Sequence, residues 1–402
     1  MFRFVHCADL HLGSPFASWR KVRPETAREL ALAPFAAFDR LAERAIAAGA
    51  LFMVLAGDVF DDPAPSLYAE SRFRATLERL AAAGVRVFWA WGNHDCGALA
   101  GAELPGNTVL FPADAPARYP IEQGGRVVAT VAGIGHPAPG ERRDLAALAD
   151  GILEGAPGFR VAVVHANVDG DPDHEPYAPA PLAELKQGRA DYWALGHIHK
   201  RRVLCERPFA VYSGSAQGRS VREPGPRGGV LVEVDDAGRA TLEVLDAQRF
   251  RFETLTLDRL AAAADFPALA RVFEAALPEL REACFLRVVL AGGTALNARL
   301  RALGQEELAE LFRPRLRAKL PTAELESVVV ATTGLPGASR REGLAAEVAA
   351  VREKLDPGAL AAALPFTHAE LDGFTPEELA GIARESEELL LDYLAGDLEA
   401  TR

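Results

Sequence analysis

Five short groups of polar residues carry the side chains that could do chemistry in this sequence. They are Asp9-Leu10-His11, Gly57-Asp58, Gly92-Asn93-His94-Asp95, His165 and Gly196-His197-Ile198-His199. Carboxylate, amide and imidazole groups are the oxygen and nitrogen ligands that divalent transition metals bind. Five of the chain's nine histidines fall in these groups, a concentration that scattered core histidines would not produce.

The set is large enough to hold two divalent cations. Two ions about 3.5–4 Å apart stabilise the attacking and the leaving oxygen of an in-line displacement at phosphorus. A residue that bridges both ions must be a carboxylate, and Asp58 is the natural choice. Mixed imidazole and carboxylate donors favour Mn²⁺, with Fe²⁺ or Zn²⁺ as alternatives, over Mg²⁺ and Ca²⁺.

Each group follows an apolar run that predicts a β-strand. These runs are Arg3–His6, Leu51–Ala56, Val85–Trp89, Arg160–His165 and Tyr192–Leu195, with helices predicted at Pro34–Ala48 and Ser66–Ala83. Alone, Gly57-Asp58 fits an ordinary turn and His165 a core histidine. In open α/β sheets, however, sites form at the carboxyl ends of the strands, so we expect all five groups to converge on one edge.

Beyond residue 126 the chain predicts more strands and a domain boundary. Further strands are expected at Val127–Ile134, Phe209–Tyr212, Gly229–Val234, Ala240–Leu245 and Phe250–Leu257, the last three as an antiparallel meander. Composition shifts near Leu257, so the predicted domains are 1–257 and 258–402. The second domain reads as helix Asp258–Leu277, strand Cys284–Leu290, helix Asn297–Arg317 and strand Leu325–Thr332, followed by helices that include a capping box at Thr375–Glu378.

Length and composition limit the class of protein. A chain of 402 residues with 49% hydrophobic residues builds a sizeable core and is not disordered. No apolar run approaches the ~20 residues of a membrane-spanning helix. Met1–Leu12 lacks the features of a signal peptide, so we expect a cytoplasmic protein without a membrane partner.

Charge is unevenly distributed along the chain. The net charge is −12, with the excess acid concentrated in residues 351–402, so a nucleic-acid substrate is not excluded. Seven basic residues and two glutamates between Lys200 and Arg227 give that segment a local charge of +5. It fits either a polyanion-binding rim or a solvated basic face.

Three further features admit both a structural and a functional interpretation. Trp89 and Trp91 fit core packing or base stacking, and we favour packing. Leucines alternate with acids over Glu370–Glu399, which fits packing on the chain's own domain or docking of a partner. An acidic loop after His165 fits a plain loop better than a cation site; it contains Asp169, Asp171, Asp173 and Glu175.

The ordered motifs resemble those of the calcineurin-like metallophosphoesterase superfamily. Within it, the chain is similar to SbcD-type DNA-repair nucleases and most of all to the bacterial YhaO family. The stretches that carry this resemblance are HCADLHLGSPF, GDVFDDPAPS, GNHD, YAPAPLAELKQGRADYWALGHIHKR and YSGSAQGR, all within the first 225 residues. The resemblance implies a four-layer α/β/β/α sandwich with a smaller C-terminal α+β cap domain.

The resemblance also implies a role for each site residue. One metal would take Asp9, His11 and His199, the other would take Asn93, His165 and His197, and Asp58 would bridge both. His94 would stabilise the scissile phosphate and help protonate the leaving oxygen. Asp61 would orient His94.

The implied activity is a metal-dependent DNA exonuclease that works in repair with an SMC-like coiled-coil ATPase of the YhaN or SbcC type, possibly as a homodimer. Protein phosphatases of the superfamily continue Gly-Asp-x-x-Asp with Arg-Gly, whereas Asp62-Pro63 follows here, which favours diesters over phosphoprotein monoesters. Two alternatives stay open. One is a phosphodiesterase for a small nucleotide or lipid-linked substrate, and the other is a DNA-end-binding subunit that regulates the ATPase.

Overall fold

The computed structural model describes residues 1–16, 24–172, 174–280 and 282–335. The chain divides into two compact units, Met1–Phe252 and Glu253–Arg402. The boundary therefore lies slightly before the expected position at 257. Strand β13 (Arg251–Leu257) explains the difference, because it pairs into the sheet of the second unit.

Two six-stranded sheets form the first unit. The first has the order β12-β11-β1-β2-β3-β4, with β1 at Phe2–Cys7, β2 at Phe52–Ala56, β3 at Arg86–Ala90, β4 at Thr108–Leu110, β11 at Gly228–Val234 and β12 at Ala240–Asp246. The second has the order β5-β6-β7-β8-β10-β9, with β5 at Ala117–Gln123, β6 at Arg126–Gly133, β7 at Phe159–His165, β8 at Tyr192–Gly196, β9 at Arg202–Glu206 and β10 at Phe209–Tyr212.

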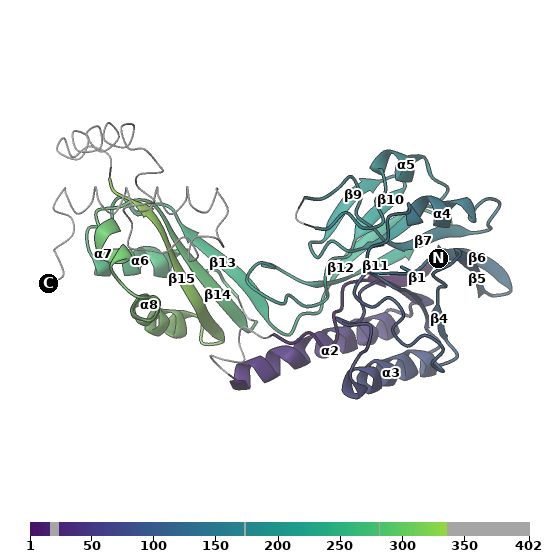
Figure 1. Cartoon of the computed structure of the whole chain (residues 1–402), viewed down its shortest axis with the longest axis horizontal. Helices are drawn as coiled ribbons and strands as arrows, with labels where there is room; N and C mark the ends of the chain where they lie inside the picture. The colour runs from purple at the N-terminus through teal and green to yellow at the C-terminus, as the bar shows by residue number, and fades with distance from the viewer. Residues whose placement is uncertain (17–23, 173, 281, 336–402) are drawn as a thin grey trace, which may run out of the picture. The chain divides into compact units, whose positions relative to one another are not determined.

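Helices cover the outer face of each sheet, which gives the predicted four layers. Helices α2 (Pro24–Ala47) and α3 (Leu67–Ala82) lie on one side of the unit, and α4 (Leu145–Gly151) and α5 (Leu182–Gln187) lie on the other (Figure 1). Successive strand side chains point to opposite faces, so each sheet contributes to two cores. Between the sheets, the rings of Phe4 and Phe52 stack 4.7 Å apart, centroid to centroid.

Helix α2 begins at Pro24, so the expected start at Pro34 is wrong. A proline usually marks the first turn of a helix because it lacks an N–H donor. Here Pro34 lies inside the helix, because the apolar face continues before it through the buried Leu30 and Ala33. Helix α3 begins as predicted, with the Ser66 side chain accepting a hydrogen bond from the Ala69 N–H at 3.2 Å.

The predicted meander is only partly correct. Strands β11 and β12 pair antiparallel, but β13 joins β14 (Cys284–Gly293) and β15 (Ala323–Thr333) in the order β13-β14-β15. Hydrophobic alternation does not reveal which sheet a strand joins.

The second unit contains shorter helices than the sequence predicts. Helix α6 spans Phe266–Ala276, because the Asp265 side chain caps it through the Ala268 N–H at 2.8 Å. The helix expected at Asn297–Arg317 is two helices, α7 (Asn297–Arg301) and α8 (Gln305–Lys319), and Gly304 caps the second. The capping box at Thr375–Glu378 and the acidic stripe at Glu370–Glu399 lie outside the described residues. Among the helices that the structure describes, none combines the length and apolarity needed to cross a bilayer.

Candidate metal centre

The predicted ligands follow strands from both sheets. Strands β1, β2 and β3 run parallel in the first sheet, and β7 and β8 run parallel in the second. The loops after β1 and β2 are joined by main-chain hydrogen bonds from Asp9 N to Gly57 O and from His11 N to Asp58 O, both 3.0 Å. Between the sheets, the His197 N–H donates to Asp9 Oδ1 at 3.1 Å. The carboxyl ends of the parallel strands of both sheets therefore meet at one edge, as the sequence predicts.

The backbone is strained where it presents these side chains. Asp9, His11, Asp58 and His197 all have positive φ, at 51°, 46°, 49° and 100°. Non-glycine residues adopt such values rarely, and when they do, they cluster at functional sites. Gly57, with φ +90°, is required for a second reason: a Cβ there would lie 2.3 Å from His165 Nδ1.

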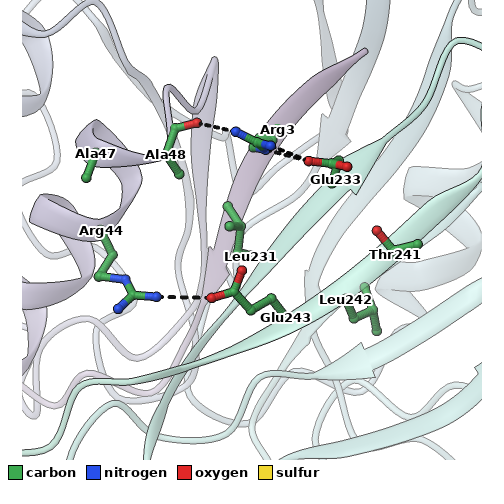
Figure 2. Close-up of a pocket in the computed structure, with 9 residues that line it drawn as sticks. All are labelled: Arg3, Arg44, Ala47, Ala48, Leu231, Glu233, Thr241, Leu242 and Glu243. Atoms are coloured by element: carbon green, nitrogen blue, oxygen red, sulfur yellow. Dashed lines mark hydrogen bonds and ion pairs between the residues drawn. The ribbon is translucent and has the colours of Figure 1, made fainter.

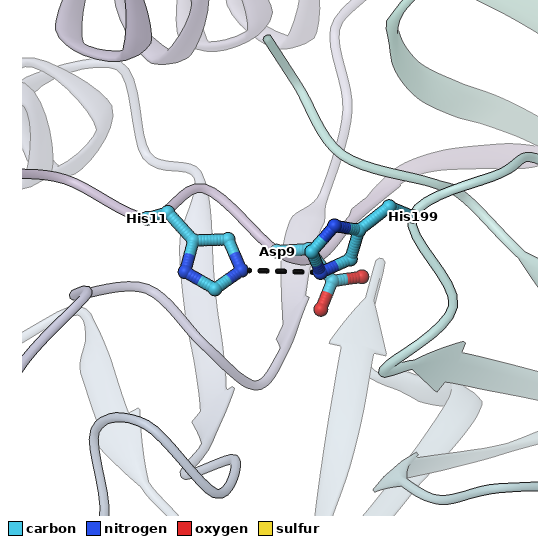
Figure 3. Close-up of side chains that lie close together, drawn as sticks. All are labelled: Asp9, His11 and His199. Atoms are coloured by element: carbon cyan, nitrogen blue, oxygen red, sulfur yellow. Dashed lines mark hydrogen bonds between the residues drawn. The ribbon is translucent and has the colours of Figure 1, made fainter. Parts of the chain in front are cut away.

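The first group of donors consists of Asp9, His11 and His199 (Figure 3). The Nε2 atoms of His11 and His199 face each other at 3.2 Å. Their Nδ1 atoms lie 2.9 Å from the carboxylates of Asp61 and Glu223, respectively. Because a carboxylate only accepts hydrogen bonds, each Nδ1 carries the proton, and in the neutral rings both Nε2 lone pairs point into the same space.

The second group has the same property. His165 Nδ1 donates to the Ala56 carbonyl at 2.9 Å, and His197 Nε2 donates to the Glu175 carbonyl at 2.8 Å. The remaining nitrogens of the two rings lie 3.0 and 3.3 Å from Asn93 Oδ1. Three lone-pair-bearing atoms therefore converge, an arrangement that a cation stabilises.

Asp58 lies between the two groups. Its Oδ2 is 3.8 Å from His11 Nε2 and 3.5 Å from His165 Nε2, and its Oδ1 accepts a hydrogen bond from the His94 N–H at 2.9 Å. The structure thus brings all seven predicted ligands together, and their tautomers and spacing fit two divalent cations with Asp58 between them.

Burial determines the electrostatics of the centre. It raises the pKa of Asp9 to about 7 and lowers the pKa of His197 to about 3. The pKa values of His11 and His165 lie well below the ordinary value for the same reason. Burial opposes protonation of His199 too, but its hydrogen bond to Glu223 and the charge of Asp9 raise its pKa. The buried Asp9 carboxyl group is therefore stabilised by holding a proton or by binding a cation.

The contact between Asp61 and His94 differs from expectation. The His94 ring lies beside the His11 ring, 5.0 Å between centroids, and its Nδ1 is 3.3 Å from the main-chain oxygen of Asp61. The Asp61 carboxylate instead accepts hydrogen bonds from His11 and, at 3.0 Å, from Arg219. The side chain of Asp61 therefore orients the candidate ligand His11, and the main-chain oxygen of Asp61 lies near His94.

Sequence reasoning missed several residues around the centre. The side chains of Glu223 and Arg219 contact His199, and the His174 ring lies 5.5 Å from the rings of both His197 and His199. The only sequence signal was their position in segments already noted as basic or acidic. Their contacts are long-range and are produced by the fold.

The basic segment is partly occupied by contacts within the protein. Arg202 pairs with Asp171 at 2.7 Å, Arg219 pairs with Asp61, and the buried Arg227 donates to the carbonyl of Pro224 at 3.0 Å. These three arginines serve the structure, so the charge available to a ligand is smaller than the count along the chain suggests.

The two tryptophans and the acidic loop after His165 have structural roles in the residues that the structure describes. Trp89 is buried, and Trp91 donates from Nε1 to the Ala98 carbonyl at 2.9 Å. In the acidic loop, Asp169 accepts a hydrogen bond from the Leu182 N–H at 2.9 Å, and Asp173 lies outside the described residues. Both observations agree with the favoured interpretations.

A separate pocket lies beside the C-terminal end of α2 and strands β11 and β12 (Figure 2). Its arginines are paired within the pocket: Arg3 contacts Glu233 at 2.6 Å, and Arg44 contacts Glu243 at 3.0 Å. With each guanidinium neutralised by a carboxylate, the pocket does not favour an anionic ligand.

Sequence comparisons relate the chain to metallophosphoesterases. The family model described as calcineurin-like phosphoesterase matches residues 2–201. The uncharacterized metallophosphoesterase YhaO of Bacillus subtilis is 32% identical over 282 residues, covering 69% of this chain and 68% of the relative. The DNA double-strand break repair protein Mre11 of Aeropyrum pernix is 28% identical over 256 residues, covering 60% of each chain. A solved dimetal phosphatase from Danio rerio is 12% identical, with a TM-score of 0.38, and covers 60% of this chain and 98% of that one.

Proposed function

We propose, from the premise that the chain belongs to the calcineurin-like metallophosphoesterase family, that it is a two-metal phosphodiesterase that acts on DNA. The observation that carries the phosphoesterase chemistry is the convergence of imidazole nitrogens from four histidines on either side of Asp58. When bound, two divalent ions would supply the positive charge that stabilises an in-line displacement at phosphorus. We propose Mn²⁺ as the metal, because the donors mix imidazole with carboxylate.

The protein's own residues would orient and protonate the substrate. His94 is exposed, its main-chain N–H donates to Asp58, and its ring lies beside the His11 ring. In this proposal the His94 ring would contact a phosphate oxygen. We propose that His94 donates the proton that the leaving oxygen takes up. The buried ligand rings, whose second nitrogens are already hydrogen-bonded, are not free for this role.

Support for a DNA substrate comes from the relatives and from charge. The similarity to a protein named for DNA double-strand break repair favours DNA. Lys200 and Arg201 directly follow the proposed ligand His199. In this proposal they would contact backbone phosphates. We further propose exonuclease action in repair with an SMC-like ATPase of the YhaN or SbcC type, and self-association as a homodimer.

The test is degradation of end-labelled linear duplex, single-stranded and closed-circular DNA with Mn²⁺, Mg²⁺ or EDTA. We expect Mn²⁺-dependent shortening of linear DNA, sparing of circles and loss of activity in the His94→Ala variant. Cleavage that survives His94→Ala unchanged would remove His94 from the mechanism. Cleavage of circles would make the enzyme an endonuclease.

A second candidate is hydrolysis of a small nucleotide or lipid-linked phosphodiester. It is favoured by the three arginines of the basic segment that are occupied within the protein. Hydrolysis of bis-p-nitrophenyl phosphate without cleavage of any DNA would support it. A third candidate is DNA-end binding that regulates an ATPase, for which DNA affinity would be unchanged by EDTA or by Asp58→Asn.

A further inference from the structure

Arg219 contacts the two carboxylates that orient histidines of the first group of donors. Its Nη1 lies 3.0 Å from Asp61 Oδ1, and its Nη2 lies 3.5 Å from Glu223 Oε1. These are the two carboxylates that accept hydrogen bonds from the Nδ1 atoms of His11 and His199. One guanidinium therefore connects the orienting groups of two ligands that come from different sheets.

The contacts close into a ring of five side chains. In order, they join His11, Asp61, Arg219, Glu223 and His199, and the two histidine Nε2 atoms close the ring at 3.2 Å. The Arg219 main-chain N–H also donates to Glu223 Oε2 at 3.0 Å. Every side chain in the ring is mostly buried, with Arg219 the most exposed at 24%.

The segment that carries Arg219 is itself anchored. The Gln217 side chain accepts a hydrogen bond from the Arg249 N–H at 2.7 Å and donates to the Phe250 carbonyl at 2.8 Å. The Arg227 N–H donates to the Gln248 side chain at 2.7 Å, and Arg227 also contacts the His199 carbonyl. The guanidinium is therefore held in place before any ligand binds.

We propose that Arg219 and Glu223 are positioning residues that set the affinity of one metal position, the one that uses His11 and His199. The inference rests on the proposed two-metal site and identifies residues that control it. Because both Nη groups are engaged by carboxylates, Arg219 acts through the ligands and not on the substrate phosphate. The fork shape is essential, since a lysine ammonium cannot contact both carboxylates in the same way.

The test is calorimetric titration of the full chain with Mn²⁺ alone, in the absence of substrate. The wild type should bind two ions. Arg219→Ala should weaken the affinity for one ion by about 10- to 100-fold, the usual effect of losing an outer partner of a metal ligand, and leave the affinity for the other ion within about twofold of the wild type. Arg219→Lys should lose as much affinity as Arg219→Ala, which would show that the fork geometry matters and not only the charge. Glu223→Gln keeps an acceptor for His199, so it should lose less affinity.

The matched control is Arg160→Ala. Arg160 makes a two-point contact with Asp191 at 3.0 and 2.8 Å and is similarly exposed, but it lies at the start of β7, away from the centre. This variant should bind both ions as the wild type does. Wild-type titration curves for both Arg219 variants would overturn the proposal. A raised KM in those variants would then make Arg219 a substrate contact. A wild type that binds fewer than two ions would instead contradict the proposed function.

Discussion

Asp58 is the residue on which both donor groups depend. It lies within 3.8 Å of an imidazole nitrogen from each group. We expect Asp58→Asn to lower kcat on a diester by more than the ~10–100-fold typical of outer partners. The kcat and the number of Mn²⁺ ions bound in calorimetric titration should fall together, while the circular dichroism spectrum stays unchanged. Retained binding of two ions would show that Asp58 does not join the two positions.

Protons and metal ions compete for the same donors. The pKa of Asp9 is raised from 3.8 to about 7, and that of His199 is also raised. The stability that comes from protonating these groups is present at low pH and is lost as the pH rises through the folded pKa values. We therefore expect Mn²⁺ to raise the melting temperature more at pH 8 than at pH 6.

Differential scanning calorimetry with Mn²⁺ and with EDTA measures this difference. Glu141→Gln is a suitable control, because the hydrogen bond from Arg143 lowers the pKa of Glu141 to about 2, outside the tested range. A metal effect that is equal at both pH values would mean that the raised pKa values do not govern binding.

At the scale of elements, the loop after β2 depends on a glycine. Gly57→Ala must adopt φ +90° and also displace the His165 ring, whereas Gly155→Ala meets no atom within 4 Å at φ +66°. Left-handed backbone costs an alanine about 1–2 kcal/mol. Gly155→Ala should lose about that much free energy of unfolding, and Gly57→Ala clearly more, in urea titrations. Equal losses of unfolding free energy in the two variants would show that the loop after β2 can change conformation at little cost.

How well the sequence predicts each element depends on the range of the interactions that determine it. The ends of β1, β2, β3, β7 and β8 were predictable because local periodicity marks a strand and a polar motif marks its end. The start of α2 was not predictable from the sequence, because the burial of Leu30 outweighs the preference of Pro34 for the first turn of a helix. The contact of Glu223 with His199 joins residues 24 positions apart, and no spacing rule anticipates it.

At the scale of the whole molecule, every described site residue lies in the first unit, Met1–Phe252. The ring around Arg219 and its anchors up to Phe250 also lie there. A chain ending at residue 252 should therefore bind two Mn²⁺ ions in calorimetric titration, as the full chain is expected to. Loss of binding in a truncated chain that is still folded by circular dichroism would show that the second unit supports the centre.

Each proposed metal position would draw ligands from both sheets: His11 and Asn93 follow strands of the first, and His199 and His197 follow strands of the second. Bound ions would therefore cross-link the two sheets. Removing them would free the carboxyl ends of five strands to separate locally, and such openings are where proteases cut. The metal supply of the cell would then set the lifetime of this protein as well as its activity.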